Sequence, residues 1–146
     1  MSDDVNLSKN GAIATISLTR AQRNNALTGA MLGELERLAL SLADDEDTRA
    51  VIFRAEGDNF SYGADIDEMG GRGGKPPTLL MLRRRAELGG RMMRAIQDIH
   101  QPTICAVQGV ATGGAACIAT ACDFRVASDD ARHGYGEVKL GINLMW

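Results

Sequence analysis

Predicted strands and helices alternate along this chain, and that alternation constrains its fold more than any other feature. Within residues 12–18, Ile16 and Leu18 alternate with Thr15 and Ser17, which is typical of a half-buried strand. Thr28 can cap a helix, and the apolar positions that follow form one stripe: Met31, Leu35, Leu38 and Leu42. Residues 50–53 are then a short buried strand. A strand, a helix and a strand in this order imply a right-handed crossover and an α/β fold.

The second half of the chain continues the same pattern. A long helix is predicted from Thr78 to about Ile99, and Pro102 stops it. Residues 103–107 return as a buried strand. The small-residue run 114–121 indicates a closely packed helix, and residues 123–127 form a further strand.

Composition excludes several classes of protein. With 146 residues, 45% of them apolar, the chain can form one domain with a hydrophobic core. A net charge of -3 argues against a nucleic-acid surface. No apolar run approaches the roughly 20 residues that span a bilayer, and the acidic start, residues 1–4, is no secretory signal. We therefore expect a cytoplasmic protein with neither nucleic acid nor membrane as a partner.

The cysteines point in the same direction. Cys105, Cys117 and Cys122 are odd in number and lack CxxC spacing. Neither a disulfide framework nor a zinc site is indicated, so we expect a reducing compartment and no bound metal.

Two glycine-bearing turns are the strongest chemical signal. Residues 59–66 follow one buried strand, and residues 109–114 follow another strand and open a helix. Glycine lets backbone N–H groups approach a ligand closely, and a helix N-terminus adds partial positive charge. Two such turns could aim two N–H groups at one oxygen, as an oxyanion hole does. Such turns also occur for packing reasons, so spacing alone leaves both interpretations open.

Four segments in order carry a family resemblance: 18-LTRAQRNNAL-27, 60-FSYGADIDEM-69, 102-PTICAVQGVATGGAACIATACDFRVAS-128 and 137-EVKLGIN-143. Over nearly its whole length the chain resembles the enoyl-CoA hydratase/isomerase, or crotonase, family. The resemblance implies a crotonase-like (ClpP/crotonase) spiral of ββα repeats around two roughly perpendicular sheets. Because the family is longer and residues 141–146 stop in apolar sequence, we interpret residues 1–146 as the N-terminal spiral domain. The interpretation is that the chain is truncated before the C-terminal helices, which would help a full-length protein form a homotrimer or a dimer of trimers.

The same resemblance implies a substrate and a binding site. The substrate would be an acyl-CoA thioester, with coenzyme A as part of the substrate and no permanently bound cofactor. The oxyanion donors would be the backbone N–H groups of Tyr62 and Gly114. Arg23 would lie near the CoA phosphates, and the chain at Asn25 and Ala26 would pass the CoA. The segment that would run along the CoA through backbone contacts comprises Gly63, Ala64, Asp65 and Ile66.

The acid–base residues depart from the hydratase pattern. Hydratases of this family use two glutamates, of which the second matches Glu137 and the first falls at Cys117. No carboxylate occurs between Gly109 and Ala121 to replace it. Hydration divides proton removal and proton delivery between two groups, whereas one base can move a proton from C2 to C4. The sequence therefore favours a Δ3,Δ2-enoyl-CoA isomerase with catalytic Glu137.

Two alternatives remain open at this point. The first is an enoyl-CoA hydratase or another crotonase-type lyase or hydrolase, which would use the same oxyanion chemistry. The second is a non-catalytic paralogue that binds CoA esters. Loss of the first glutamate favours the paralogue, and retention of Glu137 and of both glycine turns counts against it.

Overall fold

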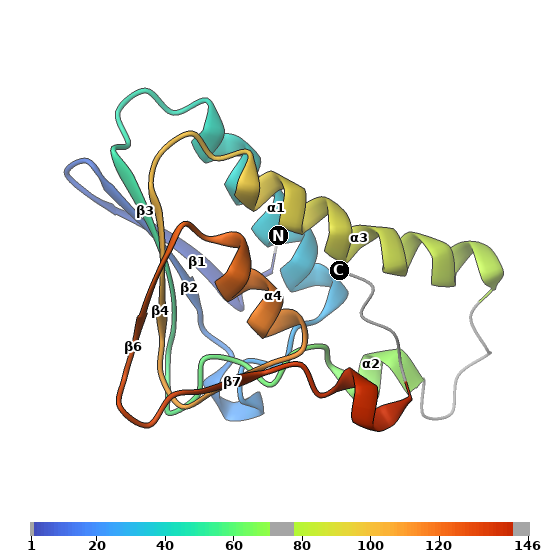
Figure 1. The fold of residues 1–146 in the computed structure, drawn as a ribbon. Helices are drawn as coiled ribbons and strands as arrows, with labels where there is room; N and C mark the ends of the chain where they lie inside the picture. Colours follow the sequence, from blue (N-terminus) through green and yellow to red (C-terminus); the bar gives the residue numbers. More distant parts are fainter. Residues whose placement is uncertain (1, 71–77, 142–146) are drawn as a thin grey trace.

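The computed structural model describes residues 2–70 and 78–141, which form two sheets and the helices around them (Figure 1). The larger sheet has five strands in the order β1-β2-β3-β4-β6. They span Val5–Asn10 (β1), Ile13–Leu18 (β2), Ala50–Ala55 (β3), Thr103–Val107 (β4) and Phe124–Ala127 (β6). The smaller sheet pairs Val110–Thr112 (β5) with Arg132–Gly134 (β7). Strand β1 runs antiparallel to β2, and every other pair is parallel.

Helices cover one face of the larger sheet and leave its other face open (Figure 1). They span Gly29–Ala43 (α1), Ile66–Gly70 (α2), Leu79–Gln97 (α3) and Gly114–Ala121 (α4), with 3-10 turns at Ala21–Arg23 (η1) and Glu137–Leu140 (η2). Helix α3 packs against both α1 and α4. The core lies between these helices and the sheet, and its largest fully buried side chains include Leu35, Phe53, Met92 and Ile96. Across the described ranges, no helix combines the length and the apolar character needed to cross a membrane.

The periodicity in the sequence predicted most of these elements correctly. In β2 the buried residues are Ala14, Ile16 and Leu18, every second position, because alternate side chains of a strand point to opposite faces. Thr28 caps α1, and its hydroxyl accepts the Met31 N–H at 3.2 Å. Strands β2 and β3 are parallel neighbours joined through α1, as predicted.

Strand β1 was not predicted from the sequence. Its residues after Val5 are mostly polar and exposed, because it is the edge strand of the sheet and lacks a covered second face. Full pairing with β2, from Val5 opposite Leu18 to Asn10 opposite Ile13, stabilises it instead. This element depends on a partner strand rather than on its own hydrophobic pattern.

The parallel strands carry both glycine-bearing turns to the same edge of the larger sheet. Strands β3, β4 and β6 run in one direction, and the smaller sheet lies roughly across their carboxyl ends (Figure 1). Strand β4 leads directly into β5 through Gly109, whose φ is +54°. The two-sheet arrangement implied by the family resemblance is therefore confirmed in the described residues.

The ion pair between Lys9 and Asp45 is expected to stop stabilising the folded state in acid. Lys9 on β1 and the Thr48 hydroxyl both donate to the Asp45 carboxylate. These hydrogen bonds, with Lys9 contributing most, lower the pKa of Asp45 from 3.8 to about 2. A depressed pKa stabilises the folded state above pH 4 and loses that effect as the pH falls from about 4 to about 2. We expect the melting temperatures of wild type and Asp45→Asn to differ at pH 6 and to converge near pH 2. A difference that is the same at both pH values would contradict this prediction.

Candidate active site

The two glycine-bearing turns meet at the carboxyl edge of the sheet. Ser61 forms an isolated bridge to Ala111 of β5, with backbone hydrogen bonds from Ser61 N to Val110 O (3.0 Å) and from Thr112 N to Ser61 O (3.2 Å). Two residues later, a Cβ placed on Gly63 would lie 2.6 Å from Thr112 O. It would also lie 3.3 Å from the Gly114 amide nitrogen, so only glycine permits this approach. The prediction that the two turns converge is confirmed.

Tyr62 does not provide a free amide. Its N–H donates to Asn24 O at 3.1 Å, and its side chain is 48% exposed. An amide with a protein acceptor is not free to bind the oxygen of a ligand, since one N–H makes one good hydrogen bond. The prediction that Tyr62 supplies one oxyanion donor is therefore wrong.

Ala64 has the amide that fits the role instead. Gly63 O accepts from Leu27 N at 2.7 Å, and Asp65 N donates to Leu27 O at 2.9 Å. These two bonds form an isolated parallel bridge between Leu27 and Ala64, in which the residues on either side of Ala64 make the hydrogen bonds, so the N–H of Ala64 points away from Leu27. Within residues 2–70 and 78–141 this N–H has no hydrogen-bond partner.

Gly114 has the second amide of this kind. It is the first residue of α4, where backbone N–H groups have no acceptor inside the helix. The helix begins with the bond from Cys117 N to Gly113 O, and no acceptor for the Gly114 N–H is found in the part of the chain that the structure describes. The peptide dipoles of α4 place partial positive charge at the same point.

Glu137 lies against these glycines. A Cβ placed on Gly113 would come within 2.8 Å of Glu137 Oε1 and 4.0 Å of the Gly63 Cα. The other carboxylate oxygen, Oε2, is buried and has no hydrogen-bond partner among the described residues. A buried carboxylate oxygen without a partner costs free energy, and such groups are typical of functional sites. The structure thus brings Glu137 to the junction of the two turns, as predicted.

Cys117 lies one turn into α4, close to Glu137. Its side chain is 3% exposed. Burial raises the pKa of the Cys117 thiol, and the negative charge of Glu137 raises it further. The thiol therefore stays protonated at neutral pH, and a nucleophilic role is disfavoured. The position at which hydratases of the family have their first glutamate is occupied here by a small neutral group.

The residues predicted to bind CoA divide into buried and accessible groups. Asn25 is completely buried, and its Nδ2 donates to Glu56 O and Asn59 O, both at 2.9 Å. Asp65 is 5% exposed and accepts from Arg20 Nη1 at 2.7 Å, which lowers the pKa of Asp65 more than any other contact does. Both side chains hold the loop together, and the expectation that the backbone of these residues runs along the CoA stays a prediction.

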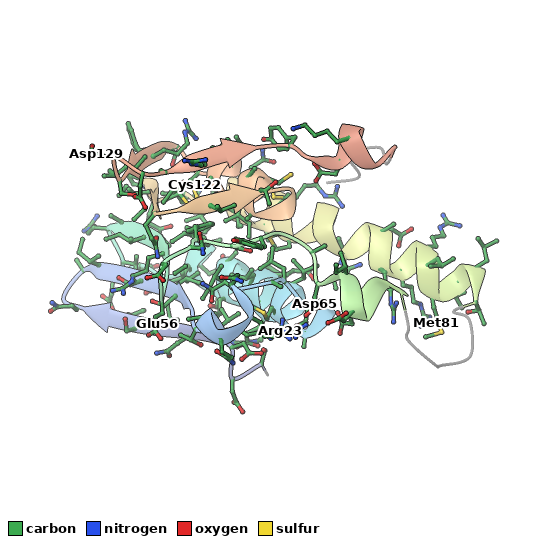
Figure 2. All side chains as sticks on the ribbon, turned by 90° about the horizontal axis from the view of Figure 1, so that it is seen from below. Arg23, Glu56, Asp65, Met81, Cys122 and Asp129 are labelled. Carbon is green, nitrogen blue, oxygen red and sulfur yellow. The ribbon has the colours of Figure 1, made fainter. Side chains whose placement is uncertain are left out.

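The other predicted CoA residues remain accessible, with one exception. Arg23 is half exposed and forms an ion pair with Asp67. It lies on the same side of the molecule as Asp65 (Figure 2). Ala26 and Ala64 are half-buried, and Ile66 is 77% exposed. Gly63 is buried, and its N–H and carbonyl group both have protein partners, so it serves the loop rather than a ligand.

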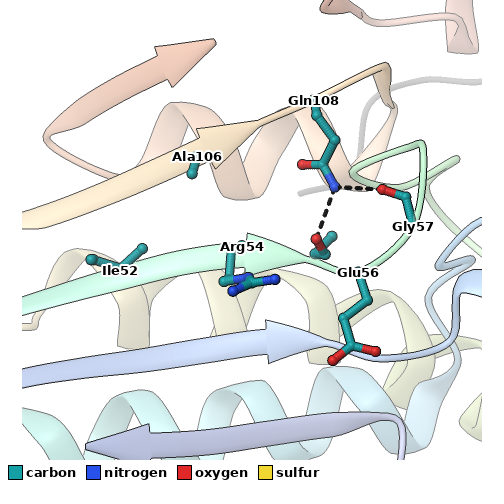
Figure 3. A pocket seen from close by; sticks show the side chains of 7 residues that line it. Ile52, Arg54, Glu56, Gly57, Ala106 and Gln108 are labelled. Carbon is teal, nitrogen blue, oxygen red and sulfur yellow. Dashed lines mark hydrogen bonds between the residues drawn. The ribbon is translucent and has the colours of Figure 1, made fainter. Parts of the chain in front are cut away.

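A separate hollow lies on the open face of the larger sheet (Figure 3). Ile52, Arg54 and Ala106 line it, and Gln108 Nε2 closes one end by donating to Ala55 O (2.8 Å) and Gly57 O (3.0 Å). Its lining includes neither the glycine turns nor Glu137. This hollow is therefore distinct from the candidate active site.

Comparisons with known proteins show which family the chain is similar to. A family model described as enoyl-CoA hydratase/isomerase matches residues 8–145. The chain is 36% identical to a short-chain-enoyl-CoA hydratase of Clostridium acetobutylicum over 96% of its own length and 52% of that protein. It is 33% identical to a crotonyl-CoA hydratase of Syntrophomonas wolfei, with the same coverage. The chain thus spans about half the length of the curated relatives that it matches.

Solved structures show the same likeness. The crystal structure of a putative enoyl-CoA hydratase/isomerase from Legionella pneumophila superposes with a TM-score of 0.87 and 32% identity. It matches 95% of this chain and 53% of that chain. An enoyl-CoA hydratase from Bacillus anthracis gives a TM-score of 0.88 at 29% identity, over 97% of this chain and 54% of that chain.

Proposed function

This chain belongs to the enoyl-CoA hydratase/isomerase family, and from that premise we propose that it binds an acyl-CoA thioester and stabilises its enolate. The observation that carries the proposal is the pair of amides on Ala64 and Gly114, which lie on adjoining turns and have no partner in the described residues. Both would donate to the thioester oxygen. Negative charge on that oxygen grows as the enolate forms, so the two N–H groups bind the transition state more tightly than the substrate.

Glu137 is the proposed base. Its Oε1 lies beside Gly113 and its Oε2 has no partner among the described residues, so we expect the carboxylate to reach the carbon next to a thioester held by the two amides. Glu137 would remove a proton from C2 of a 3-enoyl-CoA, and the electron pair would pass to the thioester oxygen. The protonated carboxyl would then return the proton at C4, which moves the double bond from C3 to C2. The reaction is an isomerisation that needs no second acid or base.

Hydration is the second candidate function, and the names of the relatives favour it. Both curated relatives described above are hydratases. Addition of water to a 2-enoyl-CoA needs one group to activate the water and one to protonate C2. The buried Cys117 thiol, with its raised pKa, is a poor substitute for a carboxylate in either role. With Glu137 as a single carboxylate and Cys117 in place of a second one, isomerisation fits the site better than hydration does.

One spectroscopic experiment separates these functions. The native-length protein is offered a 3-enoyl-CoA and, separately, a 2-enoyl-CoA, while the absorbance of the conjugated thioester is followed. Isomerase activity raises the absorbance with the 3-enoyl substrate, and hydratase activity lowers it with the 2-enoyl substrate. A protein that retains CoA esters but changes neither absorbance would overturn both catalytic proposals.

Replacement of Cys117 by glutamate tests why the chain would be a weak hydratase. We expect Cys117→Glu to raise the rate of hydration by about 10²-fold, the lower end of what one positioned acid or base contributes, because it restores a second carboxylate near Glu137. Cys117→Ser is the matched control, since it adds a polar group without a carboxylate. Equal hydration rates for the two variants, each confirmed to be folded by circular dichroism, would contradict the explanation.

A further inference from the structure

Ser61 connects the two turns that carry the proposed donors. Its backbone pairs with β5, which runs on through Gly113 to the amide of Gly114. Its side chain is completely buried. The Ser61 hydroxyl donates to Asn25 O at 2.7 Å and accepts from the Gly63 N–H at 3.1 Å. One residue is thus bonded to both halves of the site.

The acceptor of the Ser61 hydroxyl is itself held firmly. Asn24 and Asn25 have φ values of 49° and 51°, a left-handed conformation that is uncommon outside glycine. Their two carbonyl groups accept from successive residues of the facing loop: Asn24 O from Tyr62 N, and Asn25 O from the Ser61 hydroxyl. The Asn25 side chain then fixes this turn to Glu56 O and Asn59 O.

The bond from Gly63 N to Ser61 Oγ has a directional consequence. It holds the peptide group that precedes Gly63, whereas the next peptide group, which carries the Ala64 N–H, is held by the bond from Leu27 N to Gly63 O at 2.7 Å. Gly63 is thus fixed on both sides, although glycine by itself has little steric restriction on φ and ψ. Without the Ser61 bond the peptide group of Ala64 would be held from one side only, and the distance between the two proposed donors would vary.

We propose that Ser61 is a positioning residue that holds the Ala64 amide in register with the Gly114 amide. The proposal rests on the proposed function, since it concerns the same oxyanion site. Ser61 touches neither substrate nor reacting atoms in this scheme. It acts only through the peptide groups to which it is bonded.

The experiment measures enolate formation directly. Two full-length proteins are compared, the wild type and Ser61→Ala. Each is mixed with a β-ketoacyl-CoA, whose enolate absorbs in the near ultraviolet, and in a separate sample with a CoA thioether that lacks the carbonyl oxygen. We expect Ser61→Ala to reduce the bound enolate about 10–100-fold, in keeping with the effect of a small misplacement of catalytic groups. Thioether affinity should stay unchanged, and kcat should fall with little change in KM.

Two further variants keep the result decisive. Ser41→Ala is the matched control: it removes a serine bond to a backbone carbonyl, Leu38 O, at 2.7 Å in α1, away from both turns. It should leave the enolate signal intact. Ser61→Cys retains weak hydrogen-bonding capacity and should give an intermediate signal; it also replaces Ser61→Ala as the test if the alanine variant does not fold.

Each remaining outcome is distinct. A full enolate signal in both folded Ser61 variants would overturn the positioning role and leave the proposed function intact. The absence of an enolate signal in the wild type would overturn the oxyanion site itself, and the role of Ser61 with it. An equal loss of thioether and β-ketoacyl-CoA binding would show that Ser61 maintains only the shape of the pocket, and would also overturn the proposal.

Discussion

Replacement of Glu137 by glutamine is expected to lower kcat with a 3-enoyl-CoA by about 10²–10⁴-fold, the usual contribution of one positioned base. Glutamine matches glutamate in shape and can occupy the same space beside Gly113. It cannot accept the proton from C2, so the loss should appear in kcat rather than in the affinity for the substrate. Steady-state kinetics and a direct binding measurement on the native-length protein check the two parts of this prediction.

The control for this variant is Glu56→Gln. Glu56 follows the carboxyl end of β3, and its exposed side chain (labelled in Figure 2) makes no hydrogen bond or ion pair with the described residues. The Glu56→Gln variant should leave kcat unchanged. If Glu137→Gln retains turnover within about threefold of wild type, Glu137 is not the base and the isomerase mechanism fails.

Gly63→Ala is expected to damage both the fold and the site. Gly63 has a φ of +81°, and its new Cβ would lie 2.6 Å from Thr112 O, a backbone atom that cannot move alone. Strain in the backbone and overpacking together should cost about 3 kcal/mol of stability. Relief of the clash would separate the Ala64 and Gly114 amides, so kcat should fall by about 10²-fold or more, as on loss of one oxyanion donor.

Gly33→Ala is the matched control for this substitution. Gly33 lies inside α1, and a Cβ there meets nothing within 4 Å. Alanine stabilises a helix relative to glycine, so this variant should gain about 0.5–1 kcal/mol and keep its activity. Thermal unfolding and steady-state kinetics on both variants provide the comparison. Wild-type kcat in folded Gly63→Ala would show that close contact between the turns is not needed for catalysis.

The order and type of most elements followed from the sequence, because local patterns determine them. Residues 13–18 alternate in burial, and Thr28 and Thr78 cap the helices that they were expected to cap. Strand β1 was missed, because its stability comes from pairing with β2 rather than from its own pattern. The family resemblance implied a second sheet, but the local pattern did not predict its strands: β5 has only three residues, within the segment expected to be a tight turn.

For the candidate site, the sequence by itself determined which residues could take part. Glycines at 63 and 113 and the carboxylate at 137 mark two close turns and a base, because only glycine permits these approaches. Tertiary structure alone decided which amide is free. The direction of each N–H depends on its pairing with Asn24, Leu27 and Ser61, which lie in other parts of the loop or far away in the chain. Those pairings occupy the amides of Tyr62, Gly63 and Asp65, and for that reason the donor that we propose is Ala64 rather than Tyr62.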